Sequence, residues 1–133
     1  MQLAQLAKSY TKVAVNTATP GHLVLMLFDG ALRFLSTAQH GFQVEGIGER
    51  HEQIHNNLIK TQRILRELQC SLDLKAGGEF ARTMYALYDY MVEQLTRANL
   101  KKEQPPIHTV ERLLGEIRDA WAQMLEQSQA TAA

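Results

Sequence analysis

Residues 20 to 38 read PGHLVLMLFDGALRFLSTA, and this stretch decides the fold. On a helix, where each residue advances about 100°, its apolar side chains cover an arc of roughly 250°. A helix that packs one face on a core needs an arc of only about 100–150°. Leu25, Phe28 and Leu32 lie at the far edge of the arc. We therefore expect either another layer of this chain or another protein to cover them.

Three further amphipathic helices are predicted after this one. Apolar residues recur at alternating spacings of three and four in residues 49–72, 80–98 and 107–124. Glycines or prolines separate these segments at residues 46–48, 77–78 and 105–106. No segment shows the alternation of a β-strand. The sequence thus predicts an all-α protein, an antiparallel four-helix bundle over residues 19–127.

The two ends of the chain are expected to differ from the bundle. Leu3, Leu6, Tyr10 and Val13 are spaced three, four and three, which aligns them on one face of a short helix in an N-terminal arm, residues 1–18. Such a helix is marginal alone and needs a surface. It is either frayed N-terminal packing or a cover for the surplus apolar face. Residues 128–133 lack an apolar stripe and are predicted to be a loose tail.

Composition restricts the function classes. The chain has 133 residues, enough for one domain, with 45% hydrophobic residues and 14 basic side chains against 14 acidic ones. Without a basic excess or stripe, we expect no binding of nucleic acid. The longest apolar run is far too short for membrane insertion. Cys70 is the only cysteine, which suits a reducing cytoplasm. A soluble, cytoplasmic, single-domain protein is predicted.

Only a few polar residues form patterns that are typical of a catalytic or metal-binding site. His51, Glu52 and His55 form an H-E-x-x-H pattern, in which two histidines on one helical face bind zinc and the glutamate activates water. The pattern lacks an identified third ligand and a substrate cleft, so a zinc hydrolase remains only an alternative. Asp29 and Arg33, four residues apart, are expected to form a surface ion pair. With no nucleophile beside a base, we predict no catalytic residues, no metal, no cofactor and no enzyme activity.

Several apolar and aromatic residues lie outside or at the edge of the helical stripes. They suit an interface, because a tyrosine ring buries area while its hydroxyl keeps a polar partner. Together with the surplus residues of the first helix, the candidate partner-binding residues are Tyr10, Leu25, Phe28, Leu32, Ile59, Tyr85, Tyr88 and Val92. Two alternatives stay open: these are shoulder residues of an ordinary bundle, or the bundle self-associates through this face.

An ordered set of short motifs resembles the FliS family of flagellar export chaperones. The set begins with Tyr10-x-x-x-x-Val15-x-Thr17-Ala18-Thr19-Pro20 and Leu25-Met26-Leu27-Phe28-Asp29-Gly30-Ala31. It continues with Ser71-Leu72-Asp73, Gly77-Gly78-Glu79, Leu87-Tyr88-x-Tyr90-Met91, Arg97-Ala98-Asn99, Leu113-Leu114 and Asp119-Ala120-Trp121. The set spans nearly the whole chain. Phe28 stands where the family usually has tyrosine, and Thr19 where it has serine.

The resemblance implies a partner and a mechanism. Members of this family are antiparallel four-helix bundles that bind the C-terminal segment of flagellin in the cytoplasm. They stop flagellin from polymerising early and assist its delivery to the type III export gate. The family's N-terminal arm, with the position that matches Tyr10, is associated with covering the groove and with flagellin binding. The resemblance therefore implies flagellin and an export-gate component as partners.

Overall fold

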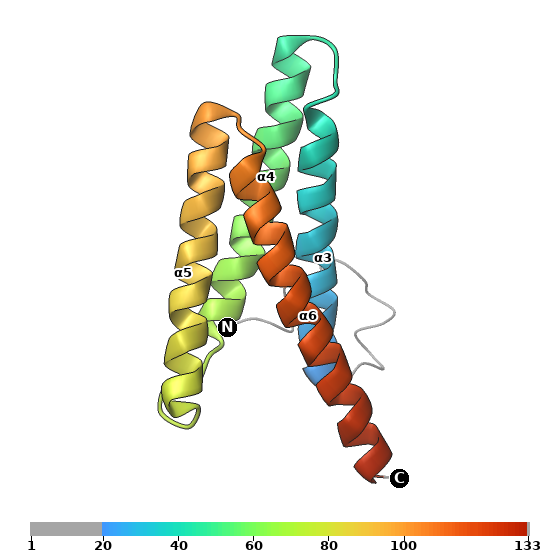
Figure 1. Cartoon of the computed structure of the whole chain (residues 1–133), viewed down its shortest axis with the longest axis vertical. Coiled ribbons are helices and arrows are strands. Elements are labelled where there is room, and N and C mark those ends of the chain that lie inside the picture. The colour runs from blue at the N-terminus through green and yellow to red at the C-terminus, as the bar shows by residue number, and fades with distance from the viewer. Residues whose placement is uncertain (1–19, 133) are drawn as a thin grey trace.

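Four helices make up the part of the chain that the structure, a computed structural model, describes: residues 20–132, with side chains to residue 128. They are α3 (Pro20–Gly41), α4 (Ile47–Cys70), α5 (Gly78–Lys101) and α6 (Pro105–Ala132). Successive helices run in opposite directions (Figure 1). The prediction of an all-α antiparallel four-helix bundle is confirmed. The N-terminal arm, with Leu3, Leu6, Tyr10 and Val13, lies outside the described residues.

The apolar stripes meet in one core along the bundle axis. Helix α3 packs against α4 and α6, and α5 packs against the same two neighbours, so α3 and α5 face each other diagonally. The completely buried residues with the largest side chains include Leu27, Leu35, Ile54, Leu58, Leu65, Met91, Leu95, Ile107 and Leu114. Each such side chain contributes about 1.5–3 kcal/mol when it leaves water. This burial supplies most of the driving force for the fold.

The closest helix pair, α3 and α4, depends on small residues. A Cβ atom on Gly41 would lie 2.9 Å from Cγ1 of Ile54 and 3.3 Å from the Ile54 backbone nitrogen. The end of α3 therefore approaches α4 more closely than any side chain there would allow. Gln53 reinforces the contact, since its Nε2 donates to the Thr37 carbonyl at 3.0 Å.

Two sequence-based predictions are wrong in detail. Residues 128–132, expected in a loose tail, belong to α6, because the alanines and glutamines there favour helix and no glycine or proline intervenes. Asp29 pairs with Arg118 of α6, its Oδ1 lying 2.7 Å from the Arg118 Nε, and not with Arg33. Arg118 reaches the Asp29 carboxylate from a neighbouring helix, whereas the Arg33 side chain remains exposed.

Helix α6 covers much of the surplus apolar face of α3. Phe28 is only 2% exposed and meets Trp121 edge-on, with ring centroids 6.4 Å apart. Leu25 and Leu32 are half-buried. Leu25 lies midway between Gly21 and Asp29 at four-residue spacings, and both of those residues contact α6. A second layer of this chain therefore accounts for part of the wide apolar arc.

Candidate partner-binding groove

An apolar groove of about 490 Å³ opens between the N-terminal half of α5 and the C-terminal half of α6. We call it the α5–α6 groove. Its floor consists of Val24, Phe28, Leu68 and Leu72, with Ser71 beside them. Its walls are Phe80, Met84 and Tyr88 from α5 and Ile117, Ala120, Trp121 and Met124 from α6. None of the described residues that line it is charged, so its chemistry suits an apolar ligand segment.

The groove lies beside the polar contacts that tie α6 to α3. Figure 1 shows α6 crossing the bundle obliquely, so that its C-terminal half leaves α5 and projects beyond the start of α3. Arg118 pairs with Asp29, and the Trp121 indole Nε1 donates to the Gly21 carbonyl at 2.9 Å. Across residues 78–126, no described side-chain hydrogen bond joins α5 to α6. Over these residues, apolar packing holds the α5–α6 contact.

Exposed apolar side chains extend the groove outward. Phe80 is 72% exposed, and Leu74 and Met124 are each nearly half exposed. Single exposed apolar residues are common on proteins, but here Phe80 and Met124 stand on opposite walls of one groove. Such a continuous apolar surface is typical of a site that another chain covers.

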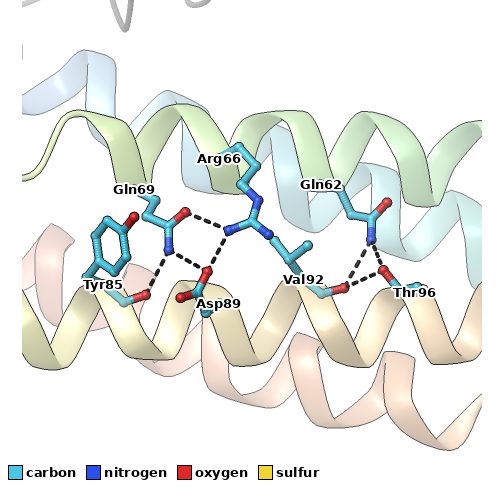
Figure 2. A network of polar contacts seen from close by, with 7 residues as sticks. All are labelled: Gln62, Arg66, Gln69, Tyr85, Asp89, Val92 and Thr96. Atoms are coloured by element: carbon cyan, nitrogen blue, oxygen red, sulfur yellow. Dashed lines mark hydrogen bonds and ion pairs between the residues drawn. The ribbon is translucent and has the colours of Figure 1, made fainter.

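The α4–α5 contact has the opposite character. Figure 2 shows Gln62, Arg66 and Gln69 of α4 reaching across to α5. Gln69 donates to the Tyr85 carbonyl and to Asp89, each at 2.9 Å, and Arg66 Nη1 lies 2.6 Å from the same Asp89 oxygen. The hydrogen bond from Gln69 and then that from Arg66 lower the pKa of Asp89. These polar groups bind one another and hold the two helices together.

Profile and sequence comparisons agree with the fold. The profile of the family described as "Flagellar protein FliS" matches residues 2–128. The chain belongs to the FliS family. A relative from Bacillus subtilis (strain 168), named flagellar secretion chaperone FliS, is 37% identical over 118 residues, covering 89% of this chain and 84% of the relative. The protein of the same name from Salmonella typhimurium is 35% identical over 130 residues, covering 93% of each chain.

In this FliS-family chain, the predicted partner-binding residues divide between two surfaces. Phe28 and Tyr88 line the α5–α6 groove. Ile59 and Val92 instead line a shallow depression of about 560 Å³ between α4 and α5, where Tyr85 lies nearby and is 40% exposed. Leu25 and Leu32 lie on α3 and line neither. Tyr10 is outside the described residues.

Most of the groove walls of this FliS-family bundle were not predicted from the sequence. Met84, Ile117 and Trp121 belong to the apolar stripes predicted for residues 80–98 and 107–124, and they do pack against the core. Their second role follows from the oblique path of α6, which leaves the outer edge of the α6 stripe uncovered. A usable signal was Trp121, a large residue near the end of the last apolar stripe, where a short bundle has little core left to fill.

The H-E-x-x-H residues lie on the surface of α4. His51, Glu52 and His55 are all exposed, and the His55 Nδ1 lies 2.9 Å from the Asn99 amide nitrogen. Within residues 20–132, no three His, Cys, Asp or Glu side chains are grouped so that they could hold a metal ion. In the same residues, no helix combines the length and the apolar character that crossing a bilayer requires.

Proposed function

We propose that this chain is an export chaperone for flagellin that works in the cytoplasm and uses the α5–α6 groove to bind the C-terminal segment of its client. Binding keeps flagellin from polymerising early and presents it to a component of the type III export gate. The observation that carries the proposal is the groove itself: a groove of about 490 Å³, lined mainly by apolar side chains, in a member of a family of flagellar secretion chaperones.

The energetics favour an amphipathic client helix. A segment that is unstructured when free gains by placing its apolar face in a groove lined by apolar side chains. Covering three large side chains, such as Phe80, Met84 and Met124, contributes on the order of 5–8 kcal/mol before the ordering cost of the client. Because that cost consumes several kcal/mol, the bound state is expected to be specific and reversible.

A matched pair of substitutions tests the groove. Ala120 lines the groove and is exposed, whereas Ala86 is exposed on α5 and does not line it. Ala120→Glu places a carboxylate where the client's apolar face would lie, and leaving that charge without a partner costs several kcal/mol on binding. We expect at least about 30-fold weaker binding of a flagellin C-terminal peptide, measured by calorimetry, against no change for Ala86→Glu.

Three outcomes would contradict the proposal. If both variants bound the flagellin peptide with equal affinity, the groove would not be part of the binding site. If light scattering showed that the wild-type chain self-associates and that added flagellin forms no complex with it, the chain would be a self-associating bundle and not a chaperone. Retention of about one equivalent of zinc by the purified protein would favour the hydrolase built on His51, Glu52 and His55.

We also propose that the N-terminal arm competes with the client for this apolar surface. The apolar face of Leu3, Leu6, Tyr10 and Val13 suits such a role, and the family resemblance associates the Tyr10 position with flagellin binding. Deleting residues 1–13 should then raise the fluorescence of an apolar dye and tighten the binding of the flagellin peptide. Unchanged dye binding would contradict shielding by the arm.

A further inference from the structure

One polar group in the α5–α6 groove has no hydrogen-bond partner among the described residues. Tyr88 is 3% exposed and lines the groove, yet its hydroxyl makes no hydrogen bond with any group in the described part of the chain. The other polar groups of the lining are satisfied. The Ser71 hydroxyl donates to the Glu67 carbonyl at 2.7 Å, and the Trp121 indole donates to Gly21.

The Tyr88 hydroxyl is not fully buried in the free bundle, since the described buried side-chain atom that lacks a partner is Oε2 of Glu67. Burial of the ring raises the pKa of the phenol far above the ordinary value, with no hydrogen bond contributing to the change. A client that covered the groove would displace the water at this hydroxyl. A buried hydroxyl without a partner is costly, so the client has to supply one.

The groove limits what that partner can be. A client docked as a helix satisfies its own backbone carbonyls, so only a side chain can reach the Tyr88 hydroxyl. An ionised side chain would have to lose its hydration in a groove without a counter-charge. What remains is one short or medium uncharged polar side chain, namely serine, threonine, asparagine or glutamine. A single buried polar contact of this type fixes the register of packed helices.

We propose that Tyr88 is a specificity-determining residue whose hydroxyl hydrogen-bonds to one uncharged polar side chain on the apolar face of the docked client segment. This inference rests on the proposed function, since it takes the C-terminal segment of flagellin as the occupant of the groove. The apolar walls then supply affinity, and Tyr88 sets which residue of the client lies at that point.

The first test is Tyr88→Phe, which removes only the hydroxyl. We expect the variant to be about as stable as the wild type in urea, because the hydroxyl makes no hydrogen bond with the described residues. Binding of a peptide from the flagellin C-terminus should weaken by about 3- to 10-fold, the effect of one net hydrogen bond. Tyr85→Phe is the matched control. Tyr85 is 40% exposed and lies outside the groove, so Tyr85→Phe should bind the peptide with the same affinity as the wild type.

The second test identifies the partner. Each Ser, Thr, Asn and Gln of the peptide is replaced in turn by Ala, and each peptide is measured against the wild type and Tyr88→Phe. At one position the two losses should fail to add, because both changes remove the same hydrogen bond. Additivity at every position would overturn the inference even if Tyr88→Phe binds weakly.

The remaining outcomes are distinguishable. If the wild type binds the peptide and Tyr88→Phe binds equally well or better, the Tyr88 inference fails and the proposed function stands. If the wild type does not bind the peptide at all, both fail together.

Discussion

The two sides of α5 differ in the polarity of their contacts with the neighbouring helices. Towards α4, polar side chains cross the contact: Gln62 and Gln69 each donate two hydrogen bonds to α5, and Arg66 pairs with Asp89 (Figure 2). Towards α6, the facing side chains are apolar, and the helices separate into a groove. One helix therefore borders both a contact fixed by directional bonds and, over the described groove, one formed mainly by apolar packing.

The difference explains how a small bundle can offer a binding surface without losing its fold. Hydrogen bonds between buried or half-buried groups specify one arrangement of the two helices, because any shift leaves partners unpaired. Apolar packing is less directional, so an apolar client can replace water along the α5–α6 groove at little structural cost. Stability and binding should accordingly respond to different substitutions.

The largest expected loss of stability is at the α4–α5 contact. Gln69 is buried and bonds to the Tyr85 carbonyl, Asp89 and Arg66. Gln69→Ala removes the hydrogen bonds to Tyr85, Asp89 and Arg66 and opens a small cavity, so we expect the free energy of unfolding in urea to fall by about 2–3 kcal/mol. Affinity for the flagellin peptide should stay within about twofold of the wild type. A large loss of affinity would show that the two sides of α5 are coupled.

A smaller effect is expected at the tie between α6 and α3. Trp121→Phe keeps an aromatic ring near Phe28 but removes the hydrogen bond to the Gly21 carbonyl. We expect a loss of about 1–2 kcal/mol in stability, measured by urea unfolding. Because Trp121 also forms a groove wall, peptide binding should weaken as well. Unchanged stability would mean that this hydrogen bond does not position α6.

A gain of stability is expected in the middle of α6. A Cβ atom on Gly115 would meet no atom within 4 Å, and glycine is unfavourable inside a helix. Gly115→Ala should raise stability by about 0.5–1 kcal/mol, or the midpoint of thermal unfolding by about 2–5 °C. Since Gly115 does not line the groove, peptide affinity should not change. Weaker binding by the stabilised variant would instead show that α6 bends at Gly115 to admit the client.

Much of the fold could be predicted from the sequence because local rules determine it. Apolar spacing and the glycine and proline breaks placed all four helices, and α3 begins at Pro20 as expected. The family assignment, from ordered motifs, is confirmed by the match over residues 2–128. The C-terminal extension of α6 was missed, because that segment has helix-forming residues but no apolar stripe to reveal it.

The candidate site could be predicted only in part. Phe28 and Tyr88 were selected from helical wheels and do line the groove, but a wheel does not show which neighbour covers a given edge. Ile59 and Val92 were selected by the same method and lie at the α4–α5 contact instead. The oblique path of α6 decides between these outcomes, and it depends on long-range contacts such as Asp29 with Arg118.

The last prediction concerns acid and the polar side of α5. Hydrogen bonds from Gln69 and Arg66 lower the pKa of Asp89 in the folded protein, so the carboxylate stabilises the fold above its unfolded pKa of about 4. That contribution is lost as the pH falls from about 4 through the folded pKa. Asp89→Asn keeps an acceptor oxygen but has no charge to lose. The stability difference between wild type and variant, from urea unfolding, should be constant from pH 7 to pH 5.

Below pH 4 the same difference should shrink, because protonation of Asp89 makes the wild type resemble the variant. All other carboxylates are shared by the two proteins and cancel in the comparison. The effect is expected to be small, since Asp89 is half exposed and solvent screens its pair with Arg66. A constant difference down to pH 3 would show that the charge of Asp89 adds nothing. The uncharged hydrogen bonds of Gln62 and Gln69 would then hold α4 to α5, and the contrast with the α5–α6 groove would rest on hydrogen bonding alone.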